Sequence, residues 1–273
     1  MTLETMSSPE TQIRTGNSAF SLKGRKAVVT GGGGLIGAAI VRAMADSGAS
    51  VTVLDKADDD VRALFKNSDP PINVANCDVT DFDVLADMVN GIDEDLGGID
   101  IWVNSAYPRT EDWGAKPADT PMESWRRNVD IQMNSSCLLA DYVARRMATR
   151  KSGSIISVAS IFDVVAPDFQ VYEGTDMTTT AAYAAIKGGV IAHTRFLASY
   201  YGRSGVRVNA ICPGGVRGSN QPDSFVDAYG KRTALGRMAN ADEIGPPVIF
   251  LASDAASYVT GSALMVDGGW TAI

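Results

Sequence analysis

A glycine-rich segment, TGGGGLIG at residues 30–37, constrains the fold of this 273-residue chain more than any other feature. It follows a short apolar run of strand-like character at residues 26–30 and leads into residues 35–47, whose apolar side chains recur at helical spacing. Three of its glycines stand in G-x-G-x-x-G spacing, namely Gly32, Gly34 and Gly37. Such a turn brings a bare backbone and the free N–H groups of a helix N-terminus beside a pyrophosphate. The segment therefore predicts a strand–turn–helix unit that binds a dinucleotide, with a purely structural glycine turn as the alternative.

Strand-like and helix-like segments alternate along the rest of the chain. Strand-like runs lie at residues 50–54, 72–79, 99–103, 154–158, 206–212 and 263–266, and helical patterns lie at residues 81–96, 121–150, 181–201 and 242–251. This alternation predicts an α/β fold, with a doubly wound, parallel, seven-stranded sheet and helices on both faces, the Rossmann fold. We expect a flexible N-terminal tail over residues 1–20 and a single Rossmann-fold domain over residues 21–273, since no linker or repeat divides them.

Composition and charge exclude several classes of function. The formal net charge of −8 gives no general attraction for phosphate backbones, so we expect no nucleic-acid partner. No apolar run reaches the roughly 18 residues of a membrane span, so we expect no membrane partner. The cysteines, Cys77, Cys137 and Cys212, fit no metal-ligand spacing. We therefore expect no metal, and we expect reduced thiols in a cytoplasmic protein.

An acidic residue at the end of the second strand-like run bears on the choice of cofactor. Asp55 follows the glycine turn by about twenty residues, where a carboxylate accepts hydrogen bonds from both ribose hydroxyls of an adenosine and repels a 2′-phosphate. It therefore favours NAD over NADP. Lys56 beside it favours the opposite choice, and an aspartate that merely begins a turn is the alternative interpretation.

A tyrosine and a lysine are placed to move protons. Tyr183 and Lys187 are four residues apart in a helical pattern, so their side chains share one face. An ammonium close to a phenol favours the phenolate and lowers its pKa, which suits the pair to exchange a proton with a hydroxyl or carbonyl oxygen. Ser160, just past the preceding strand, is placed to hydrogen-bond the same oxygen. The alternative is an amphipathic helix face with a solvated lysine.

With these motifs in this order, residues 22–273 resemble the short-chain dehydrogenase/reductase family. The resemblance implies hydride transfer between a nicotinamide and a carbon that bears a hydroxyl or carbonyl group. It implies that Tyr183 is the acid/base, that Lys187 lowers its pKa and holds the nicotinamide ribose, and that Ser160 orients the reacting oxygen. It also implies a homotetramer, through the helices at residues 121–150 and 181–201 and the tail at residues 270–273.

The family pattern assigns contacts with the cofactor to positions along most of the chain. The matching residues are Gly31, Gly34, Leu35, Ile36, Gly37, Asp55, Asp78, Val79, Asn104, Ala106, Tyr183, Lys187, Pro213, Gly214 and Val216. Three positions depart from the pattern. Leu35 stands where the classical branch has glycine, and Gly218 stands where a threonine often binds the carboxamide. Gln132 aligns with the catalytic asparagine of the proton relay, so either Gln132 takes that role or the relay runs elsewhere.

The substrate clues lie in two loops. Ser160 and Tyr183 are further apart than is usual in the family, and the extra segment at residues 162–180 carries four acids with Phe169 and Tyr172. An acidic, aromatic loop between two catalytic residues favours a hydroxylated or amino-bearing substrate over an apolar one. Arg109, in NSAYPR, is suited to bind a carboxylate or phosphate of the substrate bidentately, and a surface arginine is the equal alternative.

These inferences together predict an NAD-dependent oxidoreductase that acts on a polar, sugar-like small molecule. The alternatives are an NADPH-dependent keto reductase and a nucleotide-binding regulator that has lost the chemistry. The chain also resembles oxidoreductases linked to nonulosonic (legionaminic-type) acid and flagellin-glycan biosynthesis. Four segments carry this narrower resemblance, namely TGGGGLIG, NSAYPR, the VYEGT insertion and the closing DGGWTAI. That narrower resemblance implies a carbohydrate substrate.

Overall fold

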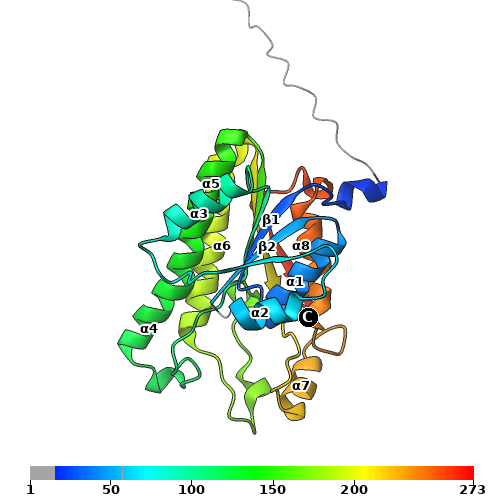
Figure 1. Ribbon diagram of the computed structural model, residues 1–273. Helices are drawn as coiled ribbons and strands as arrows, with labels where there is room; N and C mark the ends of the chain where they lie inside the picture. The colour runs from blue at the N-terminus through cyan, green and yellow to red at the C-terminus, as the bar shows by residue number, and fades with distance from the viewer. Residues whose placement is uncertain (1–15, 57) are drawn as a thin grey trace, which may run out of the picture.

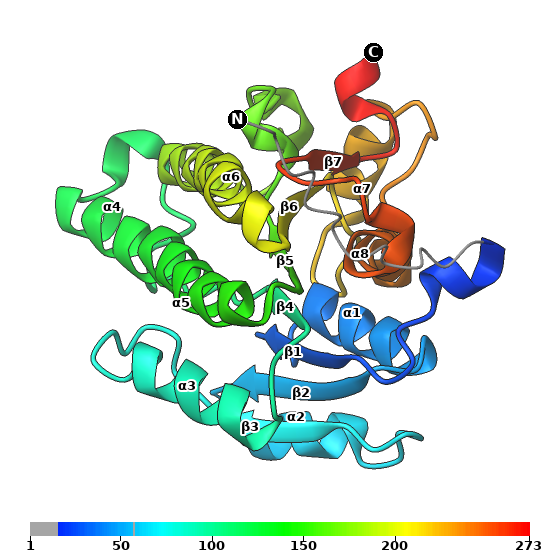
Figure 2. The same cartoon turned by 90° about the horizontal axis from the view of Figure 1, so that it is seen from above.

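Seven parallel strands form one sheet in the computed structural model, which describes residues 16–56 and 58–273 (Figure 1). The order across the sheet is β3-β2-β1-β4-β5-β6-β7 (Figure 2). The strands are β1 (Lys26–Thr30), β2 (Ser50–Asp55), β3 (Asn73–Asn76), β4 (Ile101–Asn104), β5 (Gly153–Val158), β6 (Val206–Pro213) and β7 (Ala263–Val266). The predicted doubly wound sheet is confirmed.

Helices cover both faces of this sheet, as Figure 2 shows. One face carries α1 (Leu35–Asp46), α2 (Asp58–Phe65) and α8 (Gly245–Ala252), and the other carries α3 (Leu85–Asp95), α5 (Ser135–Arg150) and α6 (Ala181–Tyr201). Because both faces are covered, the central strands are apolar rather than alternating, and every residue of β4 is buried. The sheet is therefore a rigid platform for the loops at its edges.

The carboxyl ends of the strands meet at the lower edge of Figure 1, where α7 (Asp223–Gly230, orange) also lies. The strand order reverses between β1 and β4, which pair with each other although β2 and β3 come between them in the chain. Ligands of open α/β sheets bind outside the carboxyl ends of strands at such a reversal. The topology thus selects the region around the loops after β1 and β4.

The long helix predicted over residues 121–150 is divided in the structure. It consists of α4 (Met122–Asn128), a π-helical turn (Val129–Asn134) and α5. A π-helical turn inserts an extra residue and changes the direction of the side chains within it, and such turns often lie at functional sites. Gln132 lies in this turn. Within the described residues, none of the helices combines the length and the apolar character that crossing a membrane requires.

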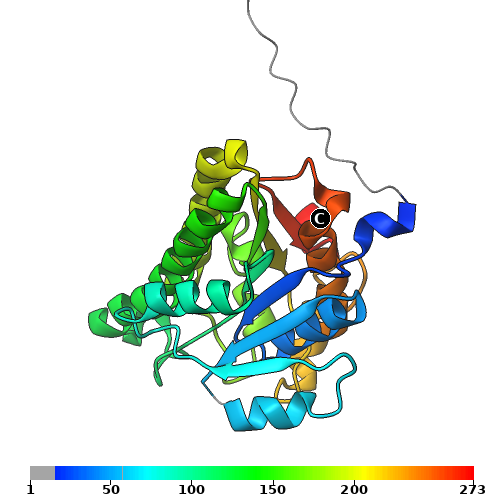
Figure 3. The same ribbon diagram turned by 45° about the horizontal axis from the view of Figure 1, so that its top comes forward.

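The expected flexible tail lies mostly outside the described residues, of which Gly16 is the first. The last five residues of that tail, Gly16–Phe20, form a 3-10 helix. Ala19 is buried there, and the Phe20 ring lies 6.4 Å from the Phe250 ring of α8. Figure 3 shows this short helix (blue) at the rim of the molecule beside α8 (orange). These residues pack against the folded chain.

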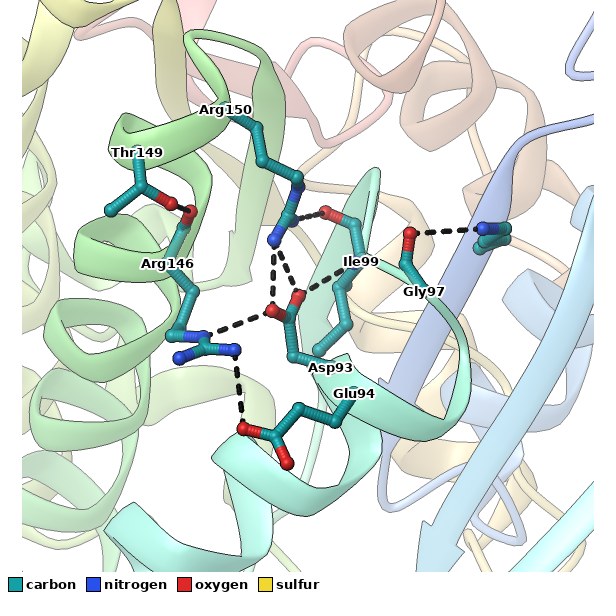
Figure 4. A network of polar contacts seen from close by, with 8 residues as sticks. Asp93, Glu94, Gly97, Ile99, Arg146, Thr149 and Arg150 are labelled. Atoms are coloured by element: carbon teal, nitrogen blue, oxygen red, sulfur yellow. Dashed lines mark hydrogen bonds and ion pairs between the residues drawn. The ribbon is translucent and has the colours of Figure 1, made fainter.

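A buried carboxylate joins α3 to α5 at the opposite edge of the sheet. Asp93 is 3% exposed, and its carboxylate accepts hydrogen bonds from the Ile99 backbone N–H (2.8 Å), Arg146 Nε (2.9 Å) and Arg150 Nη1 (2.8 Å). Figure 4 shows these groups converging on Asp93 between the two helices. Burial opposes ionisation, but the three hydrogen bonds outweigh it and hold the pKa of Asp93 below its ordinary value. The network fixes α5, which continues from the π-helical turn.

Candidate active site

A cavity of about 1080 Å³ opens at the carboxyl ends of the strands. Its walls come from the loops after β1, β2, β4, β5 and β6 and from α6. The cavity brings together Ser160, Tyr183, Lys187 and Arg109 with every residue predicted to contact the cofactor except Asn104. The volume exceeds the range of a pocket for one drug-sized molecule, so it has room for a dinucleotide and a small substrate.

The glycine turn has no space for side chains. Gly31 has a φ of +66°, and a Cβ there would lie 2.5 Å from the Ala106 Cα in the loop after β4. A Cβ on Gly37 would lie 2.1 Å from the Gly31 carbonyl oxygen. The turn can therefore pack against the loop after β4, with the N-terminus of α1 at the cavity, only because these positions are glycine. This close-packed cradle fits the pyrophosphate of a dinucleotide.

Acidic side chains lie beside the turn at the far end of the cavity. The Asp55 carboxylate accepts a hydrogen bond of 2.9 Å from the Gly33 backbone N–H. The neighbouring Lys56 points to Asp78, with 2.7 Å between Nζ and Oδ2. Burial alone would raise the pKa of Asp78, but hydrogen bonds from Lys56 and Thr80 lower it, so Asp78 is ionised. Within the described ranges, no three or more His, Cys, Asp or Glu side chains lie together as a metal site would require.

The predicted catalytic residues meet at the other end. Lys187 Nζ lies 5.6 Å from the centre of the Tyr183 ring and donates a hydrogen bond of 2.8 Å to the Val158 carbonyl at the end of β5. Burial lowers the pKa of Lys187 to about 8. Burial also raises the pKa of Tyr183, against the effect of its hydrogen bond with Ser160. Burial thus disfavours the charged form of each group, the phenolate of Tyr183 and the ammonium of Lys187.

Aromatic side chains surround Tyr183. The rings of Tyr107, Trp113 and Phe162 lie 5.8, 6.1 and 6.0 Å from its ring, each edge to face. Trp113 Nε1 donates a hydrogen bond of 2.8 Å to the Tyr107 hydroxyl, and the Arg109 guanidinium lies 5.1 Å from the centre of the Tyr107 ring. Neither Tyr107 nor Trp113 was among the predicted site residues, although Tyr107 lies in the unusual NSAYPR segment.

Two predicted site residues lie outside the cavity. Asn104 is buried, accepts a hydrogen bond of 2.7 Å from Trp102 Nε1 and donates one of 3.2 Å to the Ser136 carbonyl. Its side chain therefore links β4 to α5 and does not face the cavity. Gln132 is 6% exposed, and its Nε2 donates to Asn128 Oδ1 at 3.2 Å. Its Oε1 is buried and has no hydrogen-bond partner among the residues that the structure describes.

The insertion at residues 162–180 differs from its expected character. Only Phe162 and Tyr172 of this segment line the cavity; its four acids, Asp163, Asp168, Glu173 and Asp176, do not. Asp168 pairs with Arg232 at 2.9 Å, and the Tyr172 ring stacks on Phe225 of α7 at 5.4 Å. The acids do not reach the cavity because apolar side chains anchor the segment to α7, and the Oδ1 of Asp163 is itself buried. The insertion contributes aromatic surface.

Gln221, which was not among the predicted site residues, lies at the turn around Gly218, where the family often has threonine. The Gln221 Oε1 accepts a hydrogen bond of 2.9 Å from the Gly218 N–H, and its Nε2 donates to the Val216 carbonyl at 3.1 Å. Gln221 lines the cavity and closes this turn. Tyr229, whose hydroxyl accepts a hydrogen bond of 2.5 Å from the Gly215 N–H, fixes the next part of the same wall.

Comparison with known proteins decides the family. A family model described as enoyl-(acyl carrier protein) reductase matches residues 34–271. Cis-4-hydroxycyclohexanecarboxylate dehydrogenase from Sinomonas cyclohexanicum is 34% identical over 259 residues, which cover 91% of this chain and 97% of that relative. The chain belongs to the short-chain dehydrogenase/reductase family.

Other members of the family agree with this assignment. The 2-dehydro-3-deoxy-D-gluconate 5-dehydrogenase of Pseudoalteromonas atlantica is 33% identical over 264 residues, which cover 92% of this chain and 97% of that protein. The crystal structure of a gluconate 5-dehydrogenase from Burkholderia cenocepacia J2315, in complex with NADP and tartrate, aligns with a TM-score of 0.82 and 28% identity. The alignment covers 93% of this chain and 98% of that one. The predicted NAD(P)-dependent oxidoreductase activity is confirmed at the level of the family.

Proposed function

We propose that this short-chain dehydrogenase oxidises a hydroxyl group of a polar small molecule, or reduces the corresponding carbonyl, through Tyr183, Lys187 and Ser160. The observation that carries the proposal is that these three side chains line the same cavity as the glycine cradle. A bound nicotinamide would supply the acceptor for a hydride from the hydroxyl-bearing carbon, or the donor of a hydride to the carbonyl carbon.

The chain's own residues would handle the proton. In the oxidation direction, the Tyr183 phenolate oxygen takes the hydroxyl proton while the carbon–hydrogen bond breaks and a carbonyl forms. The Lys187 ammonium stabilises that phenolate, and the Ser160 hydroxyl holds the reacting oxygen. In the reduction direction Tyr183 gives the proton back. Burial lowers the pKa of Lys187 to about 8, so the pair can release a proton near neutral pH, and an ammonium close to the phenol favours the phenolate.

Gln132 is proposed to connect the pair to solvent. An amide oxygen that is buried without a partner costs free energy, so it needs a hydrogen-bond donor when the enzyme works. The π-helical turn that carries Gln132 packs against α6, which carries Tyr183 and Lys187. A water held by Gln132 Oε1 would pass protons between Lys187 and solvent. The longer side chain thus does the work of the family's asparagine.

We propose NAD as the preferred cofactor. The Asp55 carboxylate is held beside the glycine turn by the Gly33 N–H, where it accepts hydrogen bonds from ribose hydroxyls and repels a 2′-phosphate. Lys56, the residue that would favour NADP, is directed to Asp78 instead. The family also includes a solved dehydrogenase with NADP, so the choice depends on these side chains rather than on the fold.

The substrate class follows from the relatives and from Arg109. The relatives named above act on hydroxylated rings and sugar acids, which supports a polyhydroxylated or hydroxylated-ring substrate. Arg109 lines the cavity, which supports its proposed role as a substrate contact. The narrower resemblance to nonulosonic-acid enzymes stays a prediction. So does the cytoplasmic location, and so does the homotetramer, for which the exposed Phe196 and Tyr200 on the outer face of α6 provide an apolar contact surface.

The test combines cofactor binding with turnover. Calorimetry with NAD, NADH, NADP and NADPH should give at least tenfold tighter binding of the NAD pair. A panel of sugar acids, polyols and ring alcohols, each with the bound cofactor, should give an absorbance change at the nicotinamide band for at least one member. Tighter binding of NADPH would refute the role of Asp55, and binding of NAD without turnover of any member would favour the non-catalytic regulator.

A further inference from the structure

The charged side chains that line the cavity are divided by sign between its two ends. The glycine-turn end is lined by three acids, Asp55, Asp60 and Asp78, together with Lys56. Among the described residues that line the end around Tyr183, only Lys187 and Arg109 are charged, and both are cationic. The end at which the chemistry takes place is therefore electropositive, although the chain as a whole carries a net charge of −8.

Of these two cations, Arg109 is the one available to a substrate. Lys187 donates to the Val158 carbonyl and belongs to the proposed proton machinery. Arg109 is exposed to the cavity, and within the described residues no carboxylate lies at ion-pair distance from it. A cation that faces a cavity with no acid of its own attracts an anionic ligand.

The arginine is also held in a fixed orientation. Its guanidinium lies over the Tyr107 ring at 5.1 Å, and the Tyr107 hydroxyl is tied to Trp113 Nε1 at 2.8 Å. A ring fixed at its hydroxyl gives the guanidinium a rigid surface and lowers the entropy lost when Arg109 binds a ligand. The same Tyr107 ring lies 5.8 Å from the Tyr183 ring, so one aromatic side chain separates the cation from the catalytic phenol.

We propose that Arg109 recognises the carboxylate of a hydroxy acid whose hydroxyl-bearing carbon lies at Tyr183. This inference rests on the proposed function and names its substrate class. The planar guanidinium binds a carboxylate through two parallel hydrogen bonds. The rings of Tyr107 and Phe162 pack against the carbon skeleton between the two polar ends. A single available cation suits a monoanionic carboxylate better than a doubly charged phosphate, because Lys187, the other cation at this end, donates to the Val158 carbonyl and belongs to the proposed proton machinery.

The experiment compares matched acids and neutral analogues. D-gluconate is paired with D-glucitol, and cis-4-hydroxycyclohexanecarboxylate is paired with its carboxamide. In at least one pair the wild-type enzyme should turn over the acid with a kcat/KM about tenfold or more above that of the neutral partner. Arg109→Gln should lower kcat/KM for the acid by about tenfold or more, through KM with kcat little changed, and leave the neutral partner unaffected. Added salt should raise KM for the acid only.

Two controls separate the possible failures. Arg203→Gln removes an exposed arginine outside the cavity and should leave every constant unchanged, which excludes an effect of net charge. Equal preference for acid and neutral partner, or equal loss of both in Arg109→Gln, would overturn the inference while the oxidoreductase assignment stands. If no probe is turned over, binding of each acid to the enzyme–NADH complex is measured instead, and binding no tighter than that of its neutral partner also overturns it. Turnover that survives Tyr183→Phe would refute the proposed function itself.

Discussion

Replacing Asp93 by asparagine should destabilise the fold without touching the cavity. The carboxylate accepts three hydrogen bonds and its side chain is 4% exposed, whereas those of Arg146 and Arg150 are 36% and 32% exposed. Breaking a fully buried ion pair costs about 3–5 kcal/mol. Because water still reaches both arginines, and because asparagine keeps an acceptor for the Ile99 N–H, we expect a smaller loss of about 2–3 kcal/mol.

Thermal unfolding at a fixed protein concentration checks this value. A loss of 2–3 kcal/mol corresponds to a fall in Tm of roughly 4–12 °C for a chain of this size. Asp223→Asn, which removes an exposed partner of Arg217, is the control and should change the free energy of unfolding by less than about 1 kcal/mol. A fall in Tm for Asp93→Asn no larger than for the control would refute the reasoning.

The same variant has a defined pH dependence. The folded state holds the pKa of Asp93 below its unfolded value of 3.8, so the contribution of the carboxylate is fully present above pH 3.8. It is lost as the pH falls through the lower, folded pKa. The difference in stability between wild type and Asp93→Asn should therefore be constant near neutral pH and should shrink in strong acid. A difference that grows on acidification would contradict the assigned network.

Three further predictions concern the cavity. Gly37→Ala should abolish cofactor binding in calorimetry, because its Cβ would meet the Gly31 carbonyl at 2.1 Å, whereas Gly91→Ala, with open space around it, should bind normally. The kcat/KM for alcohol oxidation should rise up to about pH 8 and then level off, because the Tyr183–Lys187 pair loses its first proton in that range. A flat pH profile from pH 6 to 10 would contradict this prediction. Gln132→Leu should lower kcat with little change in cofactor affinity, and Gln132→Asn should restore part of it; equal rates in all three would remove Gln132 from the relay.

Much of the fold could be predicted because its strongest signals are local. The apolar runs of β1, β2, β4, β5 and β6 are buried on both faces, so each stands out in the sequence. Two helices were missed. α2 is short and begins with three aspartates, and α7 is an eight-residue helix between loops, so neither has a long apolar periodicity. Both are held by tertiary packing, which single-sequence patterns do not contain.

The candidate site was predictable where function requires a particular residue type. The glycine cradle admits no side chain, and the chemistry needs a phenol and an amine on one helix face, so Gly37, Tyr183 and Lys187 could be found from spacing. The orientation of the insertion at residues 162–180 relative to the cavity could not be predicted from the sequence. Its acids do not line the cavity, because Val171 and Tyr172 pack on α7, a contact between segments far apart in the chain. The unpaired Oε1 of Gln132 likewise depends on the π-helical turn.

The most direct test of the central claim compares Tyr183→Phe with the wild-type enzyme in two measurements on the same sample. One is the affinity for NAD, and the other is the rate at which NADH forms with a hydroxy substrate from the panel. Phenylalanine keeps the ring among its aromatic neighbours and removes only the hydroxyl that moves the proton. We predict that NAD affinity changes by less than about threefold while the rate falls by about 10²–10⁴-fold. A rate within about tenfold of the wild type would contradict the assignment of Tyr183 as the acid/base of this oxidoreductase.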